Sequence, residues 1–310
     1  MQRTQAALIV ALLGAGSTLP VTGQDAVRFR GDLQGTWSNG TITPLERPSE
    51  FAHQTYLSST QAAEYERTWL DNFRKNFSEE DLMAPDLDYT IMDRQKIVPS
   101  RRTSLVTDPP DGRLPPLLPA AKARADARPK KSNDDPEVMG MAERCLMETS
   151  FGSSPSSPPL VPSPFGQNYY EIVQTPTHVM IFSELIHDAR IIRVGGTHSP
   201  STVQSWLGDS IGHWQGDTLV VDTTNFSERT HFRSSGPRLH VVERFTRTSE
   251  TTINYTVTVD DPETWAMSWS AEVPFHAVGE RTYEYACHEG NYSMSNVLRG
   301  ARAEEKRQGR

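Results

Sequence analysis

The residues best suited to chemistry gather near the carboxyl end of the chain. Between Tyr283 and Tyr292 the sequence places a cysteine, a histidine and two glutamates among tyrosines. If this stretch is a regular strand, Cys287 and His288 point to opposite faces, which argues against a catalytic Cys–His pair. A turn at Gly290 would end that regularity, so the pairing stays open.

An acidic side chain upstream is predicted to face the interior of a sheet. In the strand expected at 239–245, alternation turns Glu243 inward together with apolar neighbours. An unpaired carboxylate in that setting costs several kcal/mol. Glu243 is therefore expected either to pair with an arginine, such as Arg247 or Arg281, or to act as a functional carboxylate.

The side on which Asp222 lies depends on the register of its strand. If it points inward it shares a cavity with Glu243, and if it does not it is a polar group at a strand end. Acid–base catalysis in a barrel pocket needs only suitably placed carboxylates and imidazoles. The candidate catalytic residues are Asp222, Glu243, His240 and His288. The candidate ligand-binding residues are Trp214, Trp269, Tyr285 and Glu289.

A metal centre is the competing use of such side chains. The chain has nine histidines, but none stands in a His-x-His or His-x-x-x-His arrangement. Zinc or non-haem iron would need distant ligands, such as His187, His240 and His288 with a carboxylate. The sequence identifies no cofactor and no metal site. A serine hydrolase is disfavoured because strands and helices do not alternate as in an α/β-hydrolase.

The first residues have the pattern of an export signal. Arg3 precedes the apolar run 6–13, and small residues at 21–23 offer a cleavage site, so we expect residues 1–23 to be a signal peptide. The run is shorter than the roughly 20 residues that cross a bilayer, and we expect no transmembrane segment. The expected location is periplasmic or secreted; an uncleaved N-terminal anchor is the alternative.

Charge and cysteine content limit the partners. The chain carries 31 basic and 39 acidic side chains, fairly interspersed, and lacks the basic face typical of nucleic-acid-binding proteins. Cys145 and Cys287 are the only cysteines. In an oxidising compartment such a pair usually forms a structural disulfide. A reactive or metal-bound Cys287 beside His288 is the alternative.

From residue 167 onward the pattern is that of β-strands separated by turns. No helical crossover separates them, so we expect an antiparallel meander that closes into a lipocalin-like barrel or a sandwich. Residues 24–310 are predicted to form this mainly β domain. The expected strands are 170–174, 179–182, 189–194, 218–223, 239–245, 253–259, 267–273 and 282–287.

Two segments precede the strands. Residues 58–73 are predicted to be a helix, because Ser58 and Gln61 can form a capping box and aromatic residues recur every four positions. This aromatic stripe is expected to pack on the sheet. A long irregular insertion spans about 83–164, and its Ser/Pro-rich part, 153–164, is expected to be a solvent-facing loop.

Several motifs resemble a large family of secreted, uncharacterised bacterial proteins. They are Trp206-x-Gly208-Asp209-Ser210, residues 216–226, Leu239-His240-x-x-Glu243-Arg244-Phe245 and residues 283–292, with further likeness at 102–113 and 186–192. This resemblance implies an exported β protein and supplies no reaction. Gly35-Thr36-Trp37 separately resembles the lipocalin entry motif, whose indole plugs the closed end of a barrel.

Two functions compete on this sequence. The first is a secreted β-barrel protein that binds a small organic ligand in a pocket lined by aromatic and carboxylate side chains. The second is an exported isomerase, lyase or hydrolase that uses Asp, Glu and His for acid–base catalysis on a small molecule, with or without a metal. A structural envelope protein is the third possibility.

Overall fold

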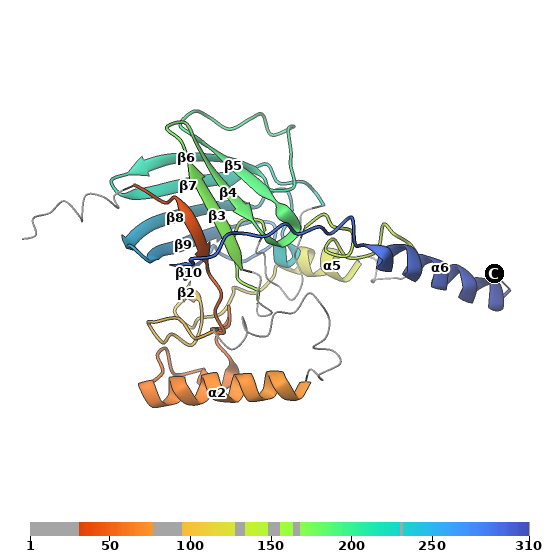
Figure 1. Cartoon of the computed structure of the whole chain (residues 1–310), viewed down its shortest axis with the longest axis horizontal. Helices are drawn as coiled ribbons and strands as arrows, with labels where there is room; N and C mark the ends of the chain where they lie inside the picture. Colours follow the sequence, from red (N-terminus) through yellow and green to blue (C-terminus); the bar gives the residue numbers. More distant parts are fainter. Residues whose placement is uncertain are drawn as a thin grey trace, which may run out of the picture.

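A closed barrel forms the centre of the computed structural model, which describes residues 31–76, 95–127, 134–147, 156–163, 168–229 and 232–309 (Figure 1). The first strand pairs with both the second and the last strand of the barrel, which closes it. The predicted β-barrel is confirmed. Its strands are β1 (Gly35–Ser38), β3 (Tyr169–Gln174), β4 (His178–Ser183), β5 (Ala189–Val194), β6 (Asp209–Gln215), β7 (Thr218–Thr224), β8 (His240–Ser249), β9 (Thr252–Asp260) and β10 (Trp269–Ala277). The predicted signal peptide, residues 1–23, lies outside the described residues.

One strand pair departs from the expected antiparallel meander. β5 and β6 run parallel, with Ile192 opposite Ser210, whereas the pairs from β6 to β10 are antiparallel. Parallel strands need a crossover of about a dozen or more residues, and the irregular segment 195–208 is long enough to supply it without a helix. The expectation of a purely antiparallel sheet was wrong. It assumed that two parallel strands must be joined by a helix, whereas β5 and β6 are joined by an irregular segment.

The strand expected at 282–287 is absent. These residues form coil and turn, and the chain continues into helix α6 (Tyr292–Arg307), which extends away from the barrel (Figure 1). β10 is already bonded to β9 along one edge and to β1 and the short strand β2 (Val106–Asp108) along the other. A closed barrel leaves no edge for a further strand to join.

The barrel interior is filled by side chains at alternate strand positions. Phe245, Tyr255 and Phe275 are fully buried and pack with ring centroids 4.9–6.2 Å apart. Such aromatic contacts add to the stability that burial provides. Met267, the first residue of the strand expected at 267–273, is 59% exposed, because β10 begins only at Trp269.

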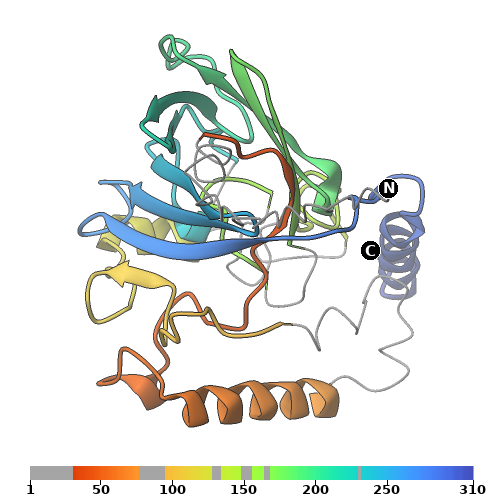
Figure 2. The ribbon, with the colours of Figure 1, turned by 60° about the vertical axis from the view of Figure 1, so that its left-hand side comes forward.

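The described residues 40–76 and 95–118 form a second layer below the barrel, as Figure 2 shows. Its longest helix is α2 (Ser59–Asn76), and its start has the predicted capping box, with Gln61 N–H donating to Ser58 and Ser58 N–H donating to Gln61. The aromatic stripe of α2 packs on Ile42, Leu57 and Ile97 in a separate small cluster rather than on the sheet. The expected packing was wrong because loops of the layer and β2 stand between α2 and the barrel.

Short helices complete the described chain. Helix α5 (Pro119–Ala127) lies next to η4, one of three 3₁₀ turns in the described residues. Those turns are η1 (Ser49–Phe51), η3 (Leu185–His187) and η4 (Phe232–Ser234). Within the described residues, none of the helices combines the length and the apolar composition that a membrane crossing requires.

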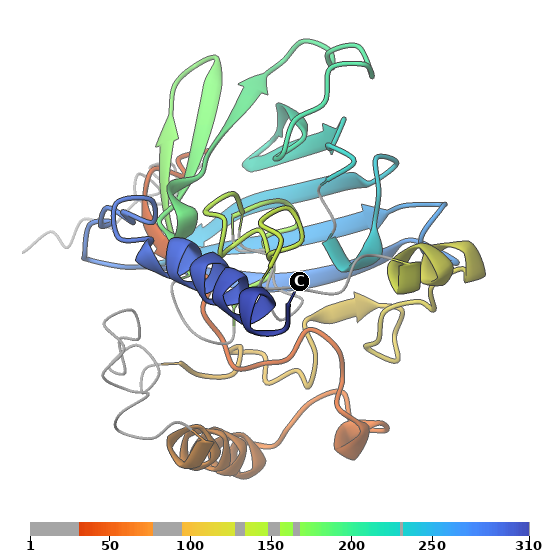
Figure 3. The same cartoon turned by 90° about the vertical axis from the view of Figure 1, so that its right-hand side faces the viewer.

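The Ser/Pro-rich segment is inside the molecule rather than in solvent. All described residues of this segment, 156–163, are buried, and Leu160 and Val161 join the apolar cluster of the barrel wall. The solvent-facing loop predicted from composition was therefore wrong for these residues. Tertiary contacts outweigh composition here, since Leu160 N–H donates to the buried hydroxyl of Tyr255 at 2.9 Å. Figure 3 shows the yellow-green part of the chain gathered with α6 at one end of the barrel.

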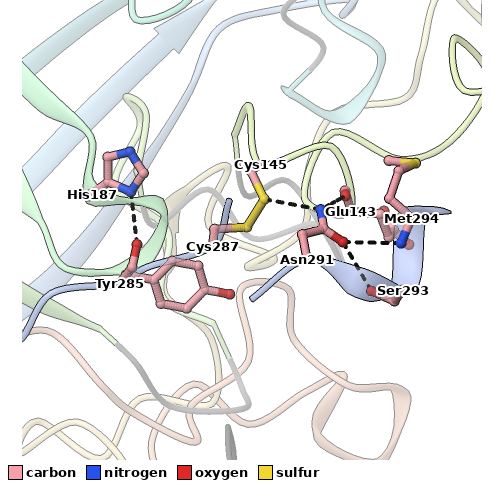
Figure 4. Close-up of a disulfide and its surroundings, with 8 residues drawn as sticks. All are labelled: Glu143, Cys145, His187, Tyr285, Cys287, Asn291, Ser293 and Met294. Atoms are coloured by element: carbon pink, nitrogen blue, oxygen red, sulfur yellow. Dashed lines mark hydrogen bonds between the residues drawn. A yellow bond between two sulfur atoms is a disulfide. The ribbon is translucent and has the colours of Figure 1, made fainter. Parts of the chain in front are cut away.

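The two cysteines form the predicted disulfide. Cys145 and Cys287 are 142 residues apart in sequence, and their Cα atoms lie 5.9 Å apart (Figure 4). Asn291, which caps α6, donates from its side-chain amide to the main chain of Glu143 at 3.0 Å. The bond and this contact tie the start of α6 to the 134–147 segment.

Candidate functional site

Strands β7 and β8 present polar residues on both faces, and alternation decides which face each residue occupies. Val221 and Thr223 of β7 and Glu243 of β8 are fully buried in the barrel. Asp222 and His240 have the opposite parity and therefore point outward, where their side chains are 36% and 40% exposed. The register that placed Asp222 beside Glu243 is not the one adopted. Asp222 and His240, both predicted to be catalytic, come together on the outer wall.

Asp222 is the centre of this outer cluster. His240 Nε2 lies 3.0 Å from Asp222 Oδ2, and His198 Nε2 lies 2.9 Å from Asp222 Oδ1. Each oxygen of the carboxylate thus accepts a hydrogen bond from a different imidazole. The cluster joins β7, β8 and the loop that follows β5.

His198 is held between two carboxylates. Its Nδ1 lies 3.0 Å from Oδ2 of Asp209, the first residue of β6. Both ring nitrogens of His198 therefore lie within hydrogen-bond distance of carboxylate oxygens. His198 has no nitrogen left for a substrate, so its role is to position Asp222.

Asp209 anchors the far end of the cluster. It forms an ion pair with Arg193 at 2.9 Å and accepts the main-chain N–H of Ser199 at 2.8 Å. Burial favours the neutral acid, but the hydrogen bonds from Arg193, Ser199 and His198 outweigh it and lower the pKa of Asp209. Asp209 is therefore ionised and fixes the orientation of His198.

The loop that carries His198 is itself tightly fitted to β7. Gly208 has φ +71°, and a Cβ there would lie 2.7 Å from Thr223 and 2.8 Å from the carbonyl of Thr224. Only glycine allows this close approach. Asn225 also donates from its side chain to the carbonyl of Ser199 at 2.9 Å. The outer cluster thus rests on a fixed loop.

His240 is the residue of the outer cluster that has a ring nitrogen available for proton transfer. The Nε2 proton inferred from its bond to Asp222 leaves Nδ1 with a lone pair, and no partner for Nδ1 is found among the described residues. A carboxylate that holds one imidazole nitrogen fixes the tautomer and stabilises the imidazolium after proton uptake. His240 can therefore accept a proton from a molecule at the surface.

The inner cluster uses the same residue types differently. Arg190 of β5 donates to both oxygens of Glu243, at 3.0 Å to Oε1, and also to Ser210 at 2.9 Å and Thr223 at 2.8 Å. Tyr255 donates its hydroxyl to Glu243 at 3.0 Å. Burial and then the charge of Glu243 raise the pKa of Tyr255 well above its ordinary value, so this hydroxyl keeps its proton.

The expected buried ion pair of Glu243 is present, but its arginine differs from those considered. The partner is Arg190, whereas Arg247 stands over the ring of Trp37 at 5.2 Å and donates to the main chain of Asp32. Glu243 and Arg190 are 0% and 3% exposed. Glu243 is thus a paired structural carboxylate, turned away from Asp222 and His240.

The remaining predicted residues lie elsewhere. His288 and Glu289 are exposed on the coil before α6, where the ring of His288 lies 6.3 Å from that of His187. The main-chain carbonyl of Tyr285 accepts from His187 Nδ1 at 3.0 Å (Figure 4). Cys287 is bonded to Cys145, so a Cys–His pair with His288 is not formed.

Trp214 and Trp269 lie in different cross-strand rows of the barrel. Strand register places Trp214 in the same row as Val273, through Leu219, Phe245 and Tyr255. Trp269 lies four residues before Val273, or about 13 Å along the strand. Trp269 is fully buried against Phe232 and Trp265. The structure does not gather the four predicted ligand-binding residues into one pocket wall.

Within the described part of the chain, no group of three or more His, Cys, Asp or Glu side chains is arranged to hold a metal ion. The sequence 208–212 has the Gly-x-Ser-x-Gly spacing of a nucleophile elbow. Ser210, however, is buried within β6 and bonded to Arg190 and Thr223. The serine is therefore a structural hydroxyl, not an exposed nucleophile.

The sequence interpretation missed Arg190, His198 and Asp209. Arg190 shares strand parity with Ile192 and Val194, which signals an inward side chain, but Ile191 on the other parity is apolar too. His198 lies in a loop and carries no periodic signal. Asp209 precedes the first buried residue of β6, a strand start that the turn-like Gly208 obscured.

No family model, curated protein or solved structure matches this chain. The resemblance of its motifs to secreted bacterial proteins therefore stays a prediction.

Proposed function

We propose that the protein is an exported enzyme that performs acid–base chemistry on a small organic molecule at the outer cluster. The single observation that carries this proposal is the His240–Asp222 pair, which leaves Nδ1 of a partly exposed imidazole without a partner among the described residues. His240 takes a proton from water or from the substrate, and Asp222 stabilises the charged ring through Nε2–H. Such a proton transfer is one established first step of isomerase, lyase and hydrolase reactions.

Hydrolysis of p-nitrophenyl acetate by the purified chain tests the proposal. General acid–base groups contribute roughly 100-fold or more to rate, so His240→Gln should lower the enzymatic rate by about that factor. Asp222→Asn should also lower the rate of ester hydrolysis. The matched control is His178→Gln, an exposed histidine on β4 that lies outside the cluster. A His240→Gln protein that melts normally and hydrolyses the ester as fast as wild type would contradict the proposal.

Export is supported by the disulfide, because such bonds persist in oxidising compartments. The leader-like pattern of residues 1–23 supports it as well. Expression with the native N-terminus should yield a periplasmic or secreted chain whose mass lacks this segment. A full-length chain with two free thiols, found only in the cytoplasmic fraction, would be the opposite result.

Carriage of a small organic ligand is a second candidate, supported by the aromatic lining of the barrel. Ligand carriage would require the side chains that fill the barrel interior to move and make room for the ligand. Comparing the native with the denatured mass of the purified chain tests it. Extra mass in the native spectrum would favour the carrier, and equal masses would favour the enzyme.

A further inference from the structure

The buried segment 156–163 is an unusual occupant of a barrel. Serine and proline are mostly found at protein surfaces, yet all eight of these residues are buried. Leu160 and Val161 are 2% and 4% exposed and belong to the barrel's apolar cluster. The segment forms no named strand of the sheet. Its burial therefore rests on tertiary contacts with the barrel and with residues next to the barrel strands.

Several of those contacts are made to the segment's main chain. The Tyr255 hydroxyl accepts the N–H of Leu160 at 2.9 Å, and the Asn39 side-chain amide donates to the Leu160 carbonyl at 3.1 Å. Asn168 makes a reciprocal pair with the main chain of Ser163, at 2.6 and 2.9 Å. Hydrogen bonds to peptide groups give affinity without depending on particular side chains, as in other peptide-binding sites.

The inner cluster orients the central contact. The Tyr255 hydroxyl donates a hydrogen bond to Glu243, so an oxygen lone pair is left for the N–H of Leu160. Glu243 is in turn fixed by Arg190. The buried ion pair thus fixes the orientation of the Tyr255 oxygen, which accepts a peptide N–H.

We propose that the barrel interior is a binding site for short, apolar, proline-containing peptides, and that residues 156–163 occupy it as an internal ligand. The segment contributes no strand to the sheet, so its release leaves the strand pairing of the barrel intact. A peptide in trans takes the same hydrogen bonds once the segment has left. This site is separate from His240 and does not depend on the acid–base function.

Calorimetric titration with a synthetic octapeptide of residues 156–163 tests the proposal. The full-length double variant Leu160→Ser/Val161→Ser weakens the internal ligand and should bind the octapeptide saturably, whereas wild type should not. An octapeptide with serine at both aliphatic positions is the control and should not bind. Adding Tyr255→Phe should weaken binding about 10-fold, the value of one hydrogen bond. A folded double variant that ignores the octapeptide, or binds both peptides alike, would overturn the proposal.

Hydrogen exchange of the wild-type protein covers the case in which the double variant does not fold. If the segment leaves by local opening, the Leu160 amide should exchange about 100-fold or more faster than the amides of Val241 and Val257 in β8 and β9. Equal exchange at all three amides would make the segment a permanent part of the core and overturn the proposal. His240→Gln should change neither the exchange nor the peptide binding, so failure of the enzyme proposal remains distinguishable.

Discussion

The inner and outer faces of β7 and β8 carry a carboxylate each, in very different surroundings. Inside, Glu243 is fully buried and accepts from Arg190 and Tyr255. Outside, Asp222 is partly exposed and accepts from two imidazoles. A buried charge must be fully paired, because desolvation is costly, whereas an exposed cluster can leave a nitrogen open. The same strands therefore supply stability on one face and available chemistry on the other.

The inner cluster gives the largest expected effect. Glu243→Gln leaves Arg190 charged and buried without its carboxylate, and breaking such a pair costs about 3–5 kcal/mol of unfolding free energy. Denaturant unfolding measures the loss. Glu272→Gln, on the outer face of β10, is the matched control and should change stability by less than about 0.5 kcal/mol. Equal stabilities of Glu243→Gln and Glu272→Gln would contradict a structural role for Glu243.

Reduction of the Cys145–Cys287 disulfide tests whether the stability of the fold and the activity of the outer cluster change independently. Loss of a native disulfide should lower the unfolding free energy by about 2–4 kcal/mol, because the bond restricts the unfolded chain. Thermal melting with and without reductant measures this. Below the transition, ester hydrolysis should persist, since strand hydrogen bonds hold His240 and Asp222. Two reactive thiols in the oxidised, unfolded chain would contradict the bond itself.

His198→Asn should have a smaller effect, on the order of 1 kcal/mol, because it removes two partly exposed hydrogen bonds. It should also lower ester hydrolysis, since Asp222 loses the partner that positions it. The control His178→Asn should leave the rate unchanged. An unaltered rate in His198→Asn would show that His240 works without the rest of the cluster.

Asp188 gives the smallest effect, and one that depends on pH. Burial, opposed by a hydrogen bond with Ser156 and by the charge of His187, raises the pKa of Asp188 from 3.8 to about 6. The folded state then holds a proton that the unfolded chain releases, so stability falls as pH rises between these values. Asp188→Asn should gain on the order of 1 kcal/mol over wild type above pH 6, after allowance for partial exposure, and the gain should shrink below pH 4. A constant difference across this range would exclude the linkage.

Alternation in the sequence predicted much of this fold. It placed Glu243 inside and proposed an arginine partner, and the capping box predicted the start of α2. The partner itself could not be predicted, because Arg190 is 53 residues from Glu243 and reaches it only through the register of the strands between. Closure of the barrel by β1 also decided that residues 282–287 have no strand to join.

The outer cluster was predicted in part. Asp222 and His240 were both candidates, but their pairing depends on register, and His198 reaches them from an irregular crossover. The burial of residues 156–163 shows the same limit, since Ser/Pro composition favours solvent and tertiary contacts override it. Local patterns thus identify elements and faces, while long-range contacts decide which side chains meet.

The tautomer of His240 is the most direct test of the central claim, that Asp222 holds Nε2 and leaves Nδ1 to accept a proton. A long-range ¹H–¹⁵N spectrum of the imidazoles in the neutral form measures it, with Asp222→Asn for assignment. The account predicts a protonated Nε2 and an unprotonated Nδ1 in wild type, with this preference lost in the variant. A protonated Nδ1 and a bare Nε2 in the wild-type protein would contradict it.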